Sequence, residues 1–204
     1  MTMPPATPAT DTELLRQLRD GVGAAFQTLY QRHQAPVYRF ALLRTGSGDT
    51  AADIVQEVFM GLLTGSFHYD PLRGLLQNFL FGVARKLILK HEQPRLRLAS
   101  LSEAKAGADP DDESAQELAS DEAEPLARLL ENETAELVRR ALAQLAPHYR
   151  DAVILYELHD LSYLDIADIC QVDIGTVRSR LSRGRAALAR RLAAHRPTAL
   201  HAST

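Results

Sequence analysis

An acidic stretch divides this sequence into two parts, and the division limits the folds that the chain can adopt. Residues 99–125 contain nine Asp or Glu and a single Lys, together with Pro110 and Pro125. Such a segment has too few large apolar side chains to offset the conformational entropy that it loses on ordering. We therefore expect a flexible acidic linker over residues 95–131, with one small domain on each side of it.

Both flanking parts have the apolar periodicity of helices, and neither alternates apolar and polar residues as a half-buried strand does. The sequence therefore predicts an all-α protein of two small helical domains. The expected organisation is a disordered tail at 1–11, domains at 12–94 and 132–194 joined by the linker at 95–131, and a C-terminal tail at 195–204. No apolar run approaches the roughly 20 residues that a membrane helix needs, so no membrane insertion is expected. Cys170 is the single cysteine, which favours the cytoplasm.

The net charge of −3 hides a strong segregation of charge. From Ile174 to the C-terminus there are seven Arg and no Asp or Glu. A basic end on an acidic chain indicates an anionic partner for that end alone.

The segment Leu161–Leu188 predicts a helix-turn-helix. Ser162 and Asp165 form a capping-box pair at the start of one helix, and Asp173 is a good N-cap for the next, from about Ile174 to Leu192. A third helix is expected from Pro147, which suits a first turn, to His159. On the last helix Val177, Leu181, Gly184 and Leu188 share one face. The opposite face carries hydroxyl and guanidinium groups, as a helix that enters the major groove requires.

Two helices are prominent in the first domain. The helix from Thr50 to Leu63, with Thr50 and Asp53 as its expected capping pair, has one apolar face and one acidic face. The helix from Leu75 to His91 buries an apolar stripe and places Phe81 and Leu89 on its other side. Those two side chains either lie on the surface or pack against a second helix, and the sequence leaves both alternatives open.

The string LSYLDIADICQVDIGTVRSRLSRGRAAL, residues 161–188, resembles the DNA-binding region four of extracytoplasmic-function (ECF) sigma factors. DTAADIVQEVFMGLL, residues 49–63, is similar to the polymerase-binding helix of region two in that family. Phe26, Leu29, Tyr30, His33 and Val37 resemble its opening helix. The resemblance implies a sigma factor that directs RNA polymerase to promoters and helps to melt them.

The resemblance also implies roles for surfaces already identified by periodicity. The helix that docks on the clamp helices of the largest polymerase subunit corresponds to Asp53, Gln56, Glu57 and Met60. The surface that binds the −10 element corresponds to Asn78, Phe81, Arg85, Lys86 and Lys90, beside the loop 65–74. The helix that reads the −35 element presents Arg178, Ser179, Ser182 and Arg183, flanked by Thr176, Arg180 and Arg185. Core polymerase and promoter DNA are thus the implied partners, and the family allows an anti-sigma factor as a third.

Some positions depart from the family pattern. Phe79, Lys86 and Lys90 stand where Trp, Asn and Asp are common, which affects the expected preference for the −10 sequence. Gln171 replaces a common glycine in the turn, a change that is tolerable if the residue avoids positive φ. Glu92 replaces a residue that is often basic or neutral.

Two other functions fit the sequence less well. A helix-turn-helix regulator that never engages polymerase would explain the C-terminal domain but leave the acidic helix unexplained. An enzyme is disfavoured because the seven histidines lack zinc-binding spacing, Cys170 has no CxxC partner and no phosphate-binding loop is present. We therefore expect no catalytic residue, no metal and no cofactor.

Overall fold

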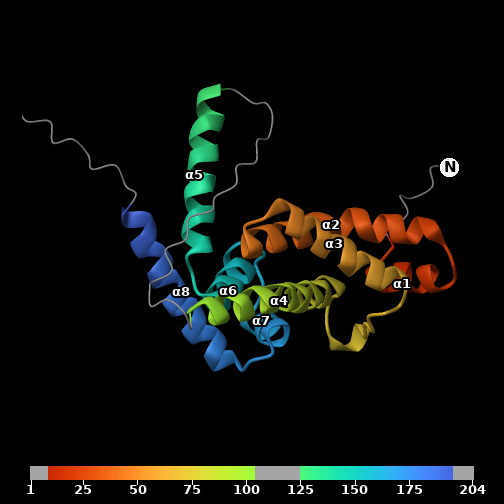
Figure 1. Cartoon of the computed structure of the whole chain (residues 1–204). Helices are drawn as coiled ribbons and strands as arrows, with labels where there is room; N and C mark the ends of the chain where they lie inside the picture. Colours follow the sequence, from red (N-terminus) through yellow and green to blue (C-terminus); the bar gives the residue numbers. More distant parts are fainter. Residues whose placement is uncertain (1–8, 104–124, 195–204) are drawn as a thin grey trace, which may run out of the picture.

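A computed structural model describes residues 9–103 and 125–194, and these residues form helices and no strand (Figure 1). The first part contains α1 (Asp11–Arg19), α2 (Gly23–Thr45), α3 (Gly48–Leu63), a 3₁₀ turn (Pro71–Arg73) and α4 (Leu76–Glu103). The second part contains α5 (Pro125–Ala143), α6 (Pro147–Glu157), α7 (Tyr163–Cys170) and α8 (Ile174–Ala194). The predicted all-α class is confirmed. The expected tails over residues 1–8 and 195–204 lie outside the described residues.

The start of α3 differs from the expected one. Ser47 is the N-cap and accepts a hydrogen bond from the Thr50 N–H at 3.2 Å, so the helix begins at Gly48 rather than at Thr50. The predicted capping pair of Thr50 and Asp53 is therefore wrong. A serine hydroxyl is as good a cap as a threonine hydroxyl, and the stretch assigned to a loop contained it.

The end of α4 also differs from the expected one. The helix extends to Glu103, beyond the predicted end at His91, and α5 begins at Pro125. Both helices therefore enter the range assigned to the linker. Leu, Arg and Ala dominate residues 95–101, and all three are strong helix formers. The linker itself remains a prediction for residues 104–124, which the structure does not describe.

The caps predicted in the second part are confirmed. Ser162 and Asp165 form a reciprocal capping box on α7, Pro147 occupies the first turn of α6, and Asp173 accepts the Thr176 N–H at 2.7 Å at the start of α8. The turn between α7 and α8 has one unexpected feature. Gln171 adopts the left-handed conformation, with φ 56° and ψ 50°, so it does not avoid positive φ as the sequence analysis required.

The two parts of the chain lie against each other. The side of α4 that does not face α2 and α3 packs on α7, and α2 contacts α5 and α6 (Figure 1). Because α4 is enclosed on two sides, its buried residues occupy most of its circumference; they include Leu80, Phe81, Ala84 and Ile88. Phe81 is therefore a packing residue in this structure. Of the two alternatives that the sequence left open, packing against a second helix is the correct one for Phe81.

Candidate nucleic-acid interface

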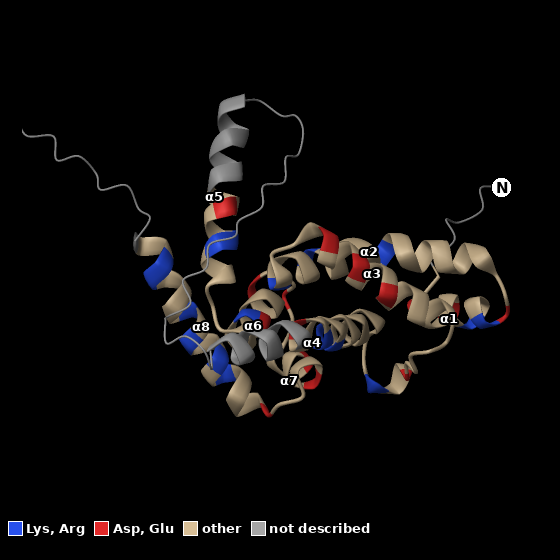
Figure 2. Ribbon diagram, in the orientation of Figure 1, with Lys and Arg blue, Asp and Glu red and all other residues tan. Residues whose placement is uncertain are grey.

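Helix α8 has one buried face and one polar face, as predicted. Val177, Leu181 and Gly184 are buried against the second domain, whereas Arg178, Ser179, Ser182, Arg183 and Arg185 are exposed. Basic residues recur along the ribbon of α8 in Figure 2. The capping bonds from Asp173 to the N–H and hydroxyl of Thr176 fix the first turn of this helix.

Neighbouring groups hold some of these side chains in place. Arg185 donates to Glu157 at 2.5 Å and lies over the Tyr156 ring, 4.7 Å from its centroid. This bond to the Glu157 carboxylate raises the pKa of Arg185, so the guanidinium stays charged. Arg180 and Thr176 are half-buried, unlike the other predicted residues of this face, and Arg180 Nη1 is buried without a partner among the described residues. The fully exposed part of the polar face is therefore narrower than the predicted one, because it lacks these two side chains.

The acidic face of α3 is also exposed as predicted. Asp53, Gln56, Glu57 and Met60 all lie at the surface. Met60 is 49% exposed. A groove of about 690 Å³ borders this face and is lined by apolar rings of α2 and α3 together with Gln56 and Met60. Acidic segments recur along α3 in Figure 2.

The five predicted −10 residues on α4 are in two different environments. Lys86 and Lys90 are exposed. The other three are covered by the second domain. The Asn78 amide donates to Asp165 at 2.7 Å, the Phe81 ring lies 4.6 Å from that of His159, and Arg85 donates to Asp151 at 2.8 Å.

A buried ion network joins the two domains. Arg44, at the end of α2, donates to Asp151 at 2.5 Å and to both carboxylate oxygens of Glu92, at 2.5 and 2.8 Å. Arg44 and Asp151 are each 1% exposed. Burial opposes the charge on Arg44, but the bonds to Glu92 and the charge of Asp151 outweigh it and raise the Arg44 pKa. The Arg44 guanidinium therefore stays charged in this network.

Arg150 completes the junction by donating to the carbonyl of Arg44 at 2.8 Å. Burial and the neighbouring Arg44 charge lower the pKa of Arg150 to about 10. The sequence pattern did not predict the interface roles of Arg44, Asp151 and His159. Two features of the sequence were signals of this network. Glu92 is an acid at a position where the family often has a basic or neutral residue. Asp151 directly precedes the buried run Ala152–Leu155 and has no basic residue beside it on the same face of its helix.

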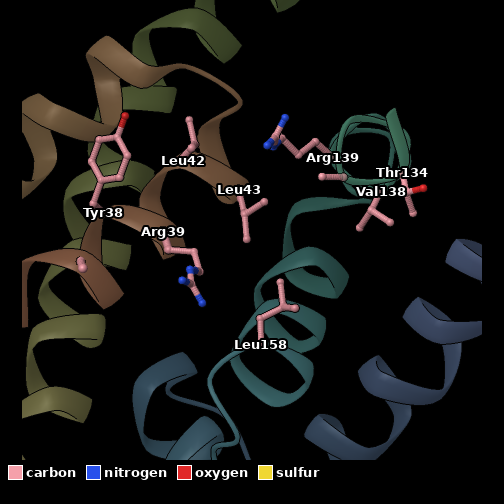
Figure 3. A pocket seen from close by; sticks show the side chains of 10 residues that line it. Tyr38, Arg39, Leu42, Leu43, Thr134, Val138, Arg139 and Leu158 are labelled. Carbon is pink, nitrogen blue, oxygen red and sulfur yellow. The ribbon is translucent and has the colours of Figure 1, made fainter. Parts of the chain in front are cut away.

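An apolar groove of about 870 Å³ opens between α2, α5 and the end of α6. Figure 3 shows Tyr38, Leu42 and Leu43 of α2 across from Val138 and Arg139 of α5, with Leu158 at one end. The groove follows the junction of the two domains, so any change in their relative position alters it.

His33 and Cys170 both lie in the interior of the protein. His33 is buried and bonds Asp11 at 2.8 Å, and burial raises the pKa of the Cys170 thiol to about 11. Among these residues no three His, Cys, Asp or Glu side chains are arranged to hold a metal ion. None of the described helices combines the length and apolar character that a membrane crossing requires.

Comparison with known proteins identifies the same two domains. The family model described as Sigma-70 region 2 matches residues 29–93, and that described as Sigma-70, region 4 matches residues 135–188. The ECF RNA polymerase sigma factor SigM of Mycobacterium tuberculosis is 31% identical over 186 residues, 90% of this chain and 85% of that protein. SigE of Mycolicibacterium smegmatis is also 31% identical, over 84% of this chain but only 63% of its own length.

Solved structures of related proteins have the same fold. The sigma factor RpoE from Bartonella quintana, in complex with the anti-sigma factor NepR, is 26% identical and superposes with a TM-score of 0.62 over 84% of this chain and 98% of RpoE. CnrH, at 20% identity and the same TM-score, supports the fold alone. Because the two family models cover more than half of the chain in the predicted order, this chain belongs to the ECF sigma factors of the sigma-70 family, which direct RNA polymerase to promoters.

Proposed function

We propose that this sigma factor uses three separate surfaces: α3 for core polymerase, α4 for the melted −10 element and α8 for the −35 duplex. One observation carries the proposal most directly. Helix α8 is the second helix of a helix-turn-helix in which both helices have N-terminal caps. Its Arg and Ser side chains point outward, and Val177 and Leu181 are buried. A helix of this kind fits the major groove, where arginine binds guanine through two hydrogen bonds.

Arg183 is the sharpest test of the α8 assignment, because it is exposed and bonds no other described side chain. We expect Arg183→Ala to reduce the affinity for a −35 duplex about tenfold or more, the loss of about 1–3 kcal/mol that a base contact supplies. Arg190→Ala is the matched control, since Arg190 is exposed on α8 but lies beyond the half that reaches base edges. Fluorescence anisotropy with a labelled duplex at several salt concentrations separates the two, because a pure phosphate contact changes chiefly the salt dependence. Equal losses in both variants would contradict the assignment.

The α3 assignment is tested by charge reversal. We expect Asp53→Lys with Glu57→Lys to abolish co-purification with core polymerase, because the clamp helices would then face two like charges. Asp20→Lys with Asp168→Lys is the matched control, with the same change of net charge at two exposed acids outside α3. Circular dichroism checks that each variant keeps its helices. Co-purification that survives the α3 reversal would reject this surface.

On α4 we propose that Asn78, Phe81, Arg85, Lys86 and Lys90 hold the single strand released at the −10 element. Arginine and lysine would follow the backbone and Phe81 would stack on a base, as in other single-strand sites. In this account the chain acts by binding alone, without catalysis, in the cytoplasm. Run-off transcription with core polymerase, followed by mapping of start sites, tests it. A regulator that never engages polymerase would yield no new start site.

We also propose an anti-sigma factor as a partner. RpoE, the 26%-identical relative, was solved with one bound. Run-off transcription with core polymerase and this chain, with and without added NepR, would show repression if the chain accepts an anti-sigma factor of that kind, and unchanged transcription would remove that candidate.

A further inference from the structure

Two tyrosines lie against the arginines at one edge of α8. The guanidinium carbon of Arg178 is 6.0 Å from the centroid of the Tyr163 ring, and that of Arg185 is 4.7 Å from the centroid of the Tyr156 ring. The two tyrosine rings are neighbours, with centroids 5.3 Å apart and planes 35° apart. We propose that this tyrosine pair positions the two arginines for −35 recognition by holding each guanidinium in the orientation in which it meets DNA. The inference rests on the proposed function of α8.

The turn between α6 and α7 brings the two tyrosines together. Tyr156 is in the last turn of α6, and Tyr163 is the first residue of α7. Across the turn the Leu161 N–H donates to the Leu155 carbonyl at 3.2 Å, and Asp160 adopts the left-handed conformation with φ 52°. Both tyrosines are half-buried, so the domain restricts the movement of their rings. The turn therefore presents two rings side by side to α8.

The spacing of the two arginines matches this pair of rings. Arg178 and Arg185 are seven residues apart, almost two full turns, so they share one face of α8 at a separation of about 10.5 Å along its axis. Both side chains are exposed. Helix α8 packs on α6 and on α7, and each of these helices supplies one of the rings. Each arginine is therefore supported by a helix other than its own.

A carboxylate gives Arg185 a second support. Glu157, the neighbour of Tyr156, accepts a hydrogen bond from Arg185 Nε at 2.5 Å. Nε carries one of the five N–H donors of a guanidinium, and the two Nη groups carry the other four. The carboxylate also cancels part of the attraction between Arg185 and any other anion. The ion pair therefore orients the guanidinium more than it strengthens general binding to DNA.

An arginine that is held in advance loses less conformational freedom when DNA binds. A free arginine side chain gives up rotamer entropy once a base or phosphate fixes it. A ring beneath the guanidinium restricts the side chain beforehand and leaves the donors in the guanidinium plane available. Cation–π contacts at exposed sites change an equilibrium constant by about two- to fivefold. The benefit is expected at the −35 site, where each arginine has a fixed partner, and not on unrelated sequences.

Double-mutant cycles in the full chain test the coupling between ring and guanidinium. Fluorescence anisotropy is measured with two labelled duplexes, the −35 site found by start-site mapping and a scrambled sequence of the same length. We expect Tyr163→Leu, which changes no charge, to weaken binding of the −35 duplex about three- to fivefold and of the scrambled duplex less than about twofold. Tyr163→Phe keeps the ring and should restore the affinity.

The background of the substitution distinguishes positioning from a general loss of structure. In an Arg178→Ala chain, Tyr163→Leu should have no further effect, because the guanidinium that the ring holds is already absent. In an Arg183→Ala chain its effect should remain in full. Absence of any loss in Tyr163→Leu, or a loss that persists undiminished in the Arg178→Ala chain, would overturn the proposal.

Arg185→Lys is a second test that leaves both tyrosines in place, and it decides the matter if Tyr163→Leu does not fold. Lysine keeps the charge but lacks the planar group that rests on a ring and reaches Glu157. We expect about a threefold loss of affinity for the −35 duplex, and no loss in the control Arg190→Lys at another exposed position of α8. Equal affinity in Arg185→Lys and the parent protein would overturn the proposal.

The single arginine variants separate this inference from the proposed function. If Arg178→Ala, Arg183→Ala and Arg185→Ala all leave duplex binding unchanged, the proposed function of α8 fails. If these variants bind more weakly but Arg178 is not coupled to Tyr163, the positioning role alone is rejected.

Discussion

Gly184 allows α8 to lie close to α6, and replacing it tests how firmly the recognition helix is positioned. A Cβ at residue 184 would lie 2.7 Å from Val153 Cγ2 and 3.4 Å from both Cβ and the carbonyl oxygen of Tyr149. Val153 is 2% exposed and β-branched, so its methyl group has little freedom to move aside. The backbone oxygen of Tyr149 belongs to α6 and cannot yield without moving that helix.

The expected loss follows from two opposing effects. Glycine to alanine in a helix gains about 1 kcal/mol from helix propensity. Forcing an extra methyl into a filled core costs about 1–3 kcal/mol. Since the contact at 2.7 Å is well inside van der Waals distance, we expect Gly184→Ala to lower the free energy of unfolding by about 1–2 kcal/mol.

Urea denaturation followed by circular dichroism measures this change. Gly82→Ala is the matched control, because a Cβ there meets nothing within 4 Å and Gly82 is also inside a helix. That control should gain about 1 kcal/mol from propensity alone. We also expect Gly184→Ala to weaken binding of a −35 duplex, because a displaced α8 carries Arg183 with it. Gly184→Ala as stable as Gly82→Ala would refute the argument that α6 and α8 are in rigid contact.

Two further perturbations test the turn and the interface. Gln171→Gly should raise the free energy of unfolding by about 1 kcal/mol, because glycine adopts φ 56° without strain. The substitution also removes the hydrogen bond that the Gln171 side-chain amide donates to the Asp168 carbonyl. A lower melting temperature would show that this hydrogen bond contributes more than the strain costs. Burial, aided by the charge of Arg39 and opposed by Asp160, lowers the pKa of His159 to about 4 from 6.5. Separation of the two domains would return His159 to water, where its imidazole takes up a proton as pH falls below 6.5. The contact between the domains therefore loses up to about 3 kcal/mol by pH 4, reduced to about 1–2 by the partial exposure of the ring. Energy transfer between dyes on cysteines placed at Asp20 and Ala189, exposed positions in the first and second domains of a Cys170→Ser chain, should fall over that range and fall less with His159→Gln; equal titrations would contradict the role of His159.

The helix-turn-helix could be predicted from the sequence because its signals are local. Ser162, Asp165 and Asp173 lie within a few residues of the backbone groups that they cap, so spacing alone specified their bonds. The outward faces of α3 and α8 were predicted for a similar reason, since a helical period separates the two sides of one element. The extension of α4 to Glu103 was missed because acidic composition and Pro94 were given more weight than the helix propensity of the residues between them.

The contact between the domains could not be predicted in the same way, because its partners lie far apart in the chain. Asp151 is separated from Arg44 by 107 residues and from Arg85 by 66, and nothing in the local pattern pairs them. The sequence did contain an indirect signal. Helix α4 has apolar residues on both sides, and a helix that is apolar all round is buried on all sides. The sequence left open whether Phe81 lies on the surface or packs against another helix. The helix that covers it could only come from the other domain.

The chemistry of α4 explains why sequence analysis assigned it to DNA and why the structure shows it bound to protein. Arg85, Asn78 and Phe81 together select for a negative charge, an acceptor and an aromatic ring. A nucleotide strand provides all three, and so do Asp151, Asp165 and His159 of the second domain.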